Sequence, residues 1–183
     1  MKKNLPPIYG LKRYYLPDEI AHHNSADDCW VSLFNQVYDL TKLIAEHYNS
    51  PLCDPLILAA GTDITHWFDP ETREPIKYAN PDTGRFETFC PTGRYLHVPD
   101  PKEDQFDLGL VMPWWQDVEQ FVIGKLTKKP RKINILNTLT KEEQIMIVAQ
   151  EETINEILDR YLIYNSHAFS YTWKRLGRVL NMN

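Results

Sequence analysis

The clearest alternation of apolar and polar positions lies in the last third of the chain. Residues 133–137 alternate as a half-buried strand does, and residues 144–149 form a second short run rich in β-branched side chains. Residues 140–143, which lie between the two runs, are polar and can turn the chain. The pattern therefore predicts two strands joined by a turn.

A helix is predicted to follow this pair of strands. Thr153 and Glu156 have the spacing of a capping box, in which the hydroxyl and the carboxylate each bind an otherwise unpaired backbone N–H. The apolar residues that follow share one helical face: Ile154, Ile157, Leu158, Tyr161 and Leu162. Residues 171–174 then predict a third strand, and Gly177 permits a tight turn into residues 179–180.

This order of elements resembles the ubiquitin-like β-grasp over about residues 132–183. The chain departs from that family because it stops at Asn183, soon after the third strand, and because it has no diglycine tail. Conjugation in the manner of ubiquitin is therefore excluded. We expect either a longer natural protein or a final strand supplied from elsewhere, because the open sheet edge otherwise lacks hydrogen-bond partners.

Short strands alternate with short helices in the first half of the chain. Residues 14–20 predict a strand that enters a helix, with Pro17 near the first helical position. Residues 22–32 predict a polar loop that runs into a strand, and residues 37–47 predict a strand, a turn and a helix that ends at His47.

Three segments of this half resemble the haem-binding domain of cytochrome b5 in sequence, order and separation. They are Asn24 with the stretch 27–30, residues 37–47, and residues 60–68. Residues 121–126 are similar to the segment that closes that domain. The resemblance covers about residues 14–68 and implies the cytochrome b5 fold there.

The expected fold class is therefore α+β, with a cytochrome b5-like domain followed by an incomplete β-grasp. The expected parts are an extension at 1–13, the cytochrome b5-like domain at 14–126 with a divergent insertion at about 69–120, a basic linker at 127–132, and the β-grasp at 133–183.

The resemblance implies haem b held between two histidine imidazoles, which set the reduction potential of the iron. His47 falls on the first ligand position of the family, although residues 48–50 replace its Pro-Gly-Gly. The second position falls near Arg73, and arginine does not normally ligate iron, so Tyr78 and His97 are the alternatives. The sequence favours the other interpretation, in which no haem is bound and His47 caps a helix as a neutral side chain.

Two further features are candidates for contact with partner proteins. Trp114 and Trp115 either cover the core of the insertion or serve as aromatic anchors of an interface. The linker carries four cations, which are either simply solvated or docked on an acidic protein surface. They are Lys128, Lys129, Arg131 and Lys132.

Composition narrows the function classes. With 20 Lys and Arg against 25 Asp and Glu, the net charge is −5, which does not suit a globally basic nucleic-acid binder. No run of apolar residues approaches the length of a membrane span. Three cysteines without a Cys-x-x-Cys pair indicate reduced thiols in an intracellular compartment. A metal site at His22, His23 and Cys29 is less favoured than a solvated loop, and no catalytic motif is present.

Over the whole chain, this combination of segments resembles a family of axonemal proteins of motile cilia that are associated with radial spokes. The resemblance implies a non-enzymatic component that docks on radial-spoke stalk and other axonemal proteins and helps regulate ciliary beating, with no nucleic-acid or membrane partner. It implies a location in the cytoplasm, the cytoskeleton and the ciliary axoneme. The alternatives are a haem-binding redox carrier or sensor and, third, an electron-donating domain for a reductase or desaturase.

Overall fold

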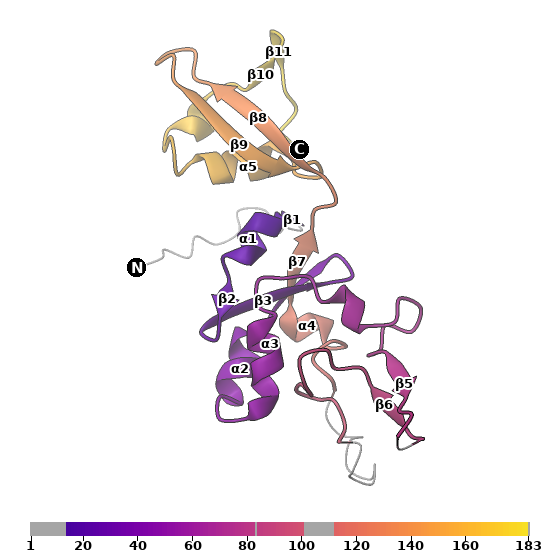
Figure 1. Cartoon of the computed structure of the whole chain (residues 1–183). Helices are drawn as coiled ribbons and strands as arrows, with labels where there is room; N and C mark the ends of the chain where they lie inside the picture. Colours follow the sequence, from indigo (N-terminus) through magenta and orange to yellow (C-terminus); the bar gives the residue numbers. More distant parts are fainter. Residues whose placement is uncertain (1–13, 83, 101–111, 183) are drawn as a thin grey trace. The chain divides into compact units, whose positions relative to one another are not determined.

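The computed structural model describes residues 14–82, 84–100 and 112–182 (Figure 1). The chain divides into two compact units between Leu126 and Thr127. One unit is Pro17–Leu126, and the other, which we call the C-terminal unit, joins Met1–Leu16 to Thr127–Asn183. The expected N-terminal extension at 1–13 lies outside the described residues.

An antiparallel sheet organises the 17–126 unit. Its strands lie in the order β7-β4-β3-β2. They are β2 (Asn24–Ser25), β3 (Asp28–Leu33), β4 (Gln36–Asp39) and β7 (Val122–Leu126). Phe34 and Asn35 both have positive φ, the geometry of the two-residue turn that joins β3 to β4. Val37 pairs with Gly124, so the segment near residue 126 closes this sheet as the cytochrome b5 resemblance implies.

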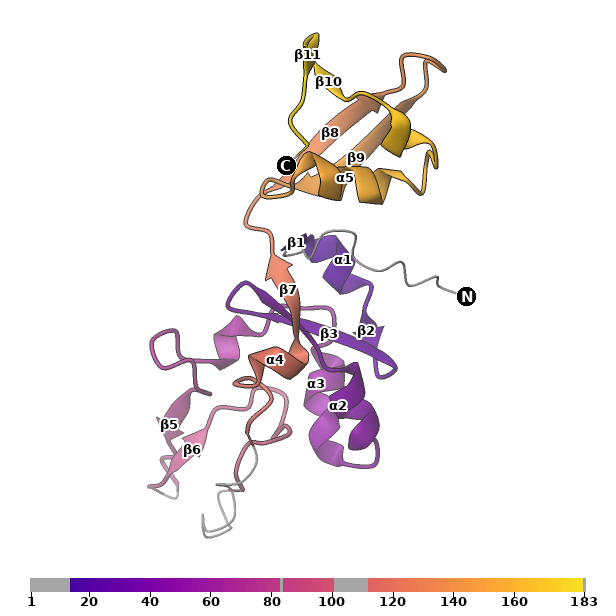
Figure 2. The same cartoon turned by 180° about the vertical axis from the view of Figure 1, so that it is seen from behind.

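Short helices connect and cover these strands. They are α1 (Pro17–Ala21), α2 (Thr41–Glu46), η1 (Pro51–Cys53), α3 (Asp54–Leu58), η2 (Thr65–Trp67) and α4 (Val118–Phe121). The helix predicted to begin at Pro17 and the helix predicted to end at His47 are both confirmed. Figures 1 and 2 show α2 and α3 side by side.

The insertion forms part of the core of this unit. Its hairpin of β5 (Lys77–Ala79) and β6 (Phe86–Thr88) is mostly exposed, but buried residues follow from position 95 on. Tyr95, Trp114 and Trp115 are buried, and the Tyr95 ring lies 5.2 Å from that of Trp67. The indoles of Trp114 and Trp115 meet edge to face at 5.5 Å, a favoured geometry for aromatic pairs. The divergent segment 69–120 therefore contributes residues of its own to the core of this unit.

The C-terminal unit is built on the predicted pair of strands and the helix after them. Its elements are β1 (Tyr14–Tyr15), β8 (Pro130–Leu136), β9 (Glu143–Ala149), α5 (Ile154–Tyr161), η4 (Ala168–Ser170), β10 (Lys174–Arg175) and β11 (Arg178–Val179). The two strands, the helix and its capping box at Thr153 and Glu156 are confirmed.

Two expectations for this unit are wrong. The third strand does not span residues 171–174, because Trp173 packs against the core and only Lys174 and Arg175 pair, with β11, in a ladder of their own. The expected linker also ends earlier, at Lys129. Its last three residues lie in β8, because the ladder with β9 extends to the pairing of Pro130 with Ala149.

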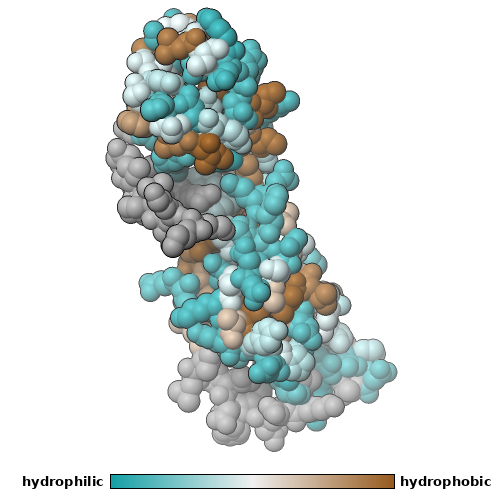
Figure 3. Space-filling model, turned by 90° about the vertical axis from the view of Figure 1, so that its left-hand side faces the viewer, coloured by the Kyte–Doolittle hydropathy of each residue, from teal (hydrophilic) through white to brown (hydrophobic). Residues whose placement is uncertain are grey.

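One face of the β8–β9 hairpin supplies the core of the C-terminal unit. Met146 and Val148 are buried with Ile157, Leu158 and Tyr161 of α5. On the other face of β9, Ile145 and Ile147 remain 53% and 45% exposed. Figure 3 shows apolar residues (brown) reaching the surface of this unit among polar ones. The described surface therefore keeps apolar area that its own core does not cover.

Candidate functional site

His47 caps the C-terminus of α2 and is half-buried. Its ring atom Nδ1 lies 3.0 Å from the carbonyl oxygen of Leu43, one turn earlier. A carbonyl can only accept a hydrogen bond, so Nδ1 carries the proton and Nε2 keeps its lone pair free. This is the tautomer in which a histidine ligates a metal through Nε2.

The residues that replace Pro-Gly-Gly close the turn after His47 through hydrogen bonds. The Ser50 N–H donates to the His47 carbonyl at 2.8 Å, and the Ser50 hydroxyl accepts from the Leu52 N–H at 3.3 Å. The Cys53 thiol donates to the same His47 carbonyl at 3.1 Å. Tyr48 is 70% exposed, so its side chain does not fill the space beside the His47 ring.

His97 is brought next to His47 from the insertion. Their ring centroids lie 6.4 Å apart, with an angle of 85° between the ring planes. His97 has a φ of 69°, which is uncommon outside glycine and tends to mark functional positions. Its Nδ1 accepts a hydrogen bond from the Trp114 N–H at 2.9 Å. Burial, and secondly the repulsion that a protonated His47 would exert, lower the pKa of His97, which favours the neutral ring.

His47 and His97 are the residues of this unit that would hold a haem iron. Their ring centroids lie 6.4 Å apart, and the tautomer of His47 suits ligation. One feature has to change when His97 ligates through Nε2. Its Nδ1 would then carry the proton and could no longer accept from Trp114.

The other candidate for the second ligand, Tyr78, and the family's second position, Arg73, lie elsewhere. Tyr78 lies on β5 and is 42% exposed. Figures 1 and 2 show β5 on the opposite side of the unit from α2, so the structure does not bring Tyr78 to His47. Arg73, at the family's second position, is exposed and its guanidinium lies 5.6 Å from the centroid of the Phe34 ring. Of the three, only His97 meets His47.

Trp114 and Trp115 are not surface anchors, so the prediction that they bind a partner is wrong. They are 0% and 7% exposed, because they pack into the aromatic core of the 17–126 unit. The Trp115 Nε1–H also donates to the Glu74 carboxylate at 3.2 Å, and Gln116 donates to the same carboxylate at 2.6 Å. The alternative role, covering the unit's own core, is the one that the structure bears out.

The four cations and His22 are exposed, whereas His23 is partly buried. Lys128, Lys129, Arg131 and Lys132 are all exposed. His23 bonds Asp28 at 2.7 Å and stacks on Trp30 at 3.5 Å. No group of three or more His, Cys, Asp or Glu side chains that could hold a metal ion occurs within residues 14–82, 84–100 and 112–182. Of the helices in those ranges, none has the length and apolar character to cross a membrane.

Sequence reasoning missed the contacts that hold His97 in place. Leu96 is buried and its N–H donates to the carbonyl of Leu52 at 3.2 Å, which ties this segment to η1. Tyr95 and Val98 are buried on either side. The available signal was the row of apolar residues flanking His97, which marks a packed segment.

Comparison with known proteins identifies the relatives of this chain. Residues 17–127 match the family model of the Cytochrome b5-like Heme/Steroid binding domain. Cytochrome b5 domain-containing protein 1 of Homo sapiens is 47% identical over 178 residues, which are 96% of this chain and 77% of that protein. The protein of the same name from Xenopus laevis is 45% identical over 172 residues, 93% of this chain and 79% of that one.

More distant matches are confined to shorter stretches. L-lactate dehydrogenase (cytochrome) of Saccharomyces cerevisiae is 39% identical over 67 residues, which are 37% of this chain and 11% of the enzyme. Among solved structures, cytochrome b558 of Ectothiorhodospira vacuolata, described as a prokaryotic homologue of cytochrome b5, is 28% identical with a TM-score of 0.29. It covers 36% of this chain and 80% of that one.

Proposed function

The chain belongs to the cytochrome b5 domain-containing protein 1 family. We propose that it is a non-enzymatic haem-binding protein of the axoneme of motile cilia. Its 17–126 unit holds haem b between His47 and His97, and the chain docks within radial spokes. The proposal that it is not an enzyme is supported by the yeast dehydrogenase, which matches over only 11% of its own length.

The observation that carries the haem proposal is the pairing of His47 with His97 at 6.4 Å. It supplies a second histidine where the position near Arg73 has none. The Leu43 carbonyl accepts from His47 Nδ1 and orients that ring for ligation. The Trp114 N–H holds the His97 ring as the structure shows it, and this hydrogen bond is given up when His97 ligates through Nε2.

When bound, haem supplies an iron that accepts and returns one electron. The residues of the chain hold it and set its surroundings. The hydrogen bond from His47 Nδ1 to the Leu43 carbonyl increases the basicity of Nε2. Leu43, Ile44 and Cys53, which precede and follow His47 in the chain, are buried in the core of the unit.

Titration of the purified full chain with haemin tests this function. We expect stoichiometric uptake with a sharp Soret band, and we expect His47→Ala to abolish that band. His22→Ala is the matched control, because His22 is an exposed histidine of the same unit and should leave the band unchanged. Absence of a sharp band in the unmodified chain, or an equal band in His47→Ala, would contradict the proposal.

The axonemal role is supported by the family to which the chain belongs and by its exposed C-terminal surface. We propose that the C-terminal unit is a ubiquitin-like β-grasp, since a hairpin and a capped helix pack on one face. The four cations at Lys128, Lys129, Arg131 and Lys132 are exposed and suit docking on an acidic axonemal protein.

Fractionation of cilia tests the docking role. The tagged protein, expressed in multiciliated cells, should stay with the axoneme after detergent removes the membrane, and should leave together with the radial spokes at high salt. Charge reversal of the four cations should reduce its retention, whereas Lys77→Glu, an exposed lysine in the other unit, should not. Release with the detergent-soluble fraction would contradict the proposal.

A further inference from the structure

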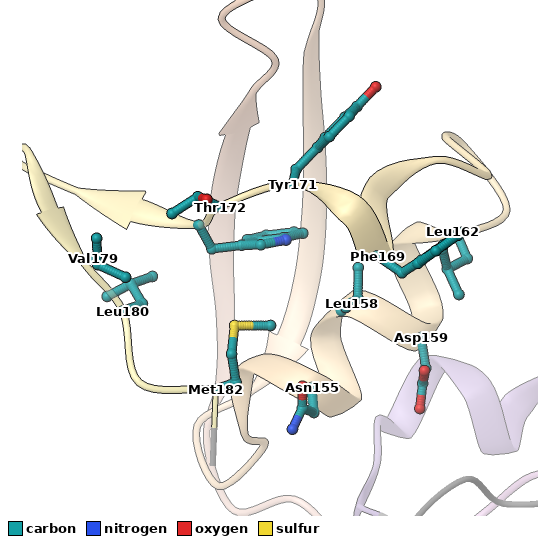
Figure 4. A pocket seen from close by; sticks show the side chains of 11 residues that line it. Asn155, Leu158, Asp159, Leu162, Phe169, Tyr171, Thr172, Val179, Leu180 and Met182 are labelled. Atoms are coloured by element: carbon teal, nitrogen blue, oxygen red, sulfur yellow. The ribbon is translucent and has the colours of Figure 1, made fainter.

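A groove of about 560 Å³ opens on the surface of the C-terminal unit. Figure 4 shows Leu158 projecting from α5, Leu162 from the C-cap of that helix, and Val179, Leu180 and Met182 from the last described segment. Eleven residues line the groove, and all of them belong to this one unit. It is therefore formed independently of the histidine pair.

The lining of the groove is mostly apolar, and part of it is strongly exposed. Phe169 is 69% exposed, Val179 is 66% exposed and Tyr171 is 36% exposed. Apolar side chains that gather in a concave surface of a soluble unit favour contact with another apolar surface, because burial removes them from water. Exposed aromatic residues are the usual anchors of such contacts.

The charge of the groove comes from one side chain. Asp159 is its only charged lining residue, and its carboxylate projects from α5 at the edge of the apolar surface (Figure 4). Burial, and secondly the negative charge of Glu156, raise the pKa of Asp159. The cations Lys174 and Arg178 of the β10–β11 hairpin do not line the groove. A cation from outside would thus stabilise the Asp159 carboxylate.

We propose that this groove is the docking site for an apolar segment of a partner protein that carries a lysine or arginine opposite Asp159. The apolar side chains of the segment cover Phe169, Tyr171 and Val179, and its cation fixes the direction in which it lies. The inference rests on the docking role proposed above and names the surface and the chemistry of the partner.

Binding of two labelled synthetic peptides to the purified full chain tests this. Both are about four helical turns long and share one stripe of leucine and phenylalanine, but one carries lysines beside the stripe and the other carries glutamates. The lysine peptide should bind about fivefold more tightly. Phe169→Ser should weaken its binding about tenfold, whereas Ile163→Ser, which removes an 81% exposed apolar residue outside the groove, should not.

Charge exchange at Asp159 completes the test. In Asp159→Lys, the preference should reverse in favour of the glutamate peptide. Equal binding of the two peptides, failure of both to bind, or an unchanged preference in Asp159→Lys would overturn the inference. Phe169 and Asp159 are exposed, so their substitution should leave the fold intact. Thermal unfolding of each variant checks this. Peptide binding needs neither haem nor an axoneme, so its failure is distinguishable from failure of the proposed function.

Discussion

At the scale of single residues, backbone groups decide what each ring of the histidine pair can do. The Leu43 carbonyl places the proton of His47 on Nδ1, which leaves Nε2 able to ligate. The Trp114 backbone N–H donates a hydrogen bond to His97 Nδ1, so the proton of the neutral ring lies on Nε2. Only His47 is therefore ready to bind iron, and His97 has to exchange one hydrogen bond first.

Gly61 is expected to tolerate no side chain. It has a φ of 80°, and a Cβ there would lie 3.1 Å from Asn24 Cβ and 3.2 Å from Ala21 Cα. Gly61→Ala should destabilise the 17–126 unit by about 1–3 kcal/mol, since strain and close contact add. Gly84→Ala is the control, because Gly84 has a similar φ of 65° with nothing within 4 Å, and it should lose less. Equal losses in chemical denaturation would refute the role of the close contact.

Acid should weaken the C-terminal unit partly through Glu151. The Thr127 hydroxyl donates to its carboxylate at 2.6 Å and, as the largest cause, lowers the pKa of Glu151 below its ordinary 4.5. The unfolded chain then binds more protons, so this contribution is present above pH 4.5 and is lost as the pH falls through the folded pKa. The acid-side loss of stability should be smaller in Glu151→Gln. An unchanged pH profile of unfolding would contradict this.

The sequence offered His47 as a candidate haem ligand but could not choose its partner. His47 lies at the end of a periodic helix within a recognisable motif, so local spacing was enough. His97 lies 50 residues later in the insertion, and its position depends on the burial of Tyr95 and Leu96 and on a backbone contact to Leu52. Contacts between residues so far apart in the sequence produce no periodic pattern of apolar and polar residues.

At the scale of elements, prediction succeeded where local hydrogen bonds decide the structure. The capping box at Thr153 and Glu156 fixes the start of α5, and the alternation of β8 and β9 fixes their pairing. It failed at residues 171–174, where β-favouring side chains are overridden by tertiary contacts. Trp173 packs against Tyr161, with ring centroids 5.7 Å apart, instead of joining a strand.

Loss of the cap should destabilise the C-terminal unit alone. In Thr153→Ala, the Glu156 N–H loses its acceptor, which costs about 1 kcal/mol and lowers the melting temperature of a unit of this size by about 4–8 °C. Thr138→Ala, in the exposed turn before β9, serves as the control. A melting curve of Thr153→Ala that coincides with that of the control would show that the cap is not stabilising.

At the scale of the whole molecule, the division between Leu126 and Thr127 separates the two proposed sites. The histidine pair lies entirely within the 17–126 unit, and the groove lies entirely within the C-terminal unit. Sequence resemblance pointed to His47, because the cytochrome b5 motif is specific, but left Tyr78 and His97 open as its partner. The groove was not foreseen, because it depends on how residues 169–182 fold back against α5.

Calorimetry should resolve this division. We expect two unfolding transitions. Haemin should raise the midpoint temperature of only one of them, the transition whose midpoint Gly61→Ala lowers, because a ligand stabilises the unit that binds it. The transition lowered by Thr153→Ala should not move with haemin. A single transition, or a haemin effect on both, would show that the two units unfold as one.

The most direct test of the account is the spin state of iron in the haemin-loaded full chain, measured by electron paramagnetic resonance. Ligation by both His47 and His97 predicts a low-spin signal that becomes high-spin in His97→Ala and stays low-spin in Tyr78→Phe. A high-spin signal in the unmodified protein, or a low-spin signal that survives in His97→Ala, would contradict the histidine pair as the haem site.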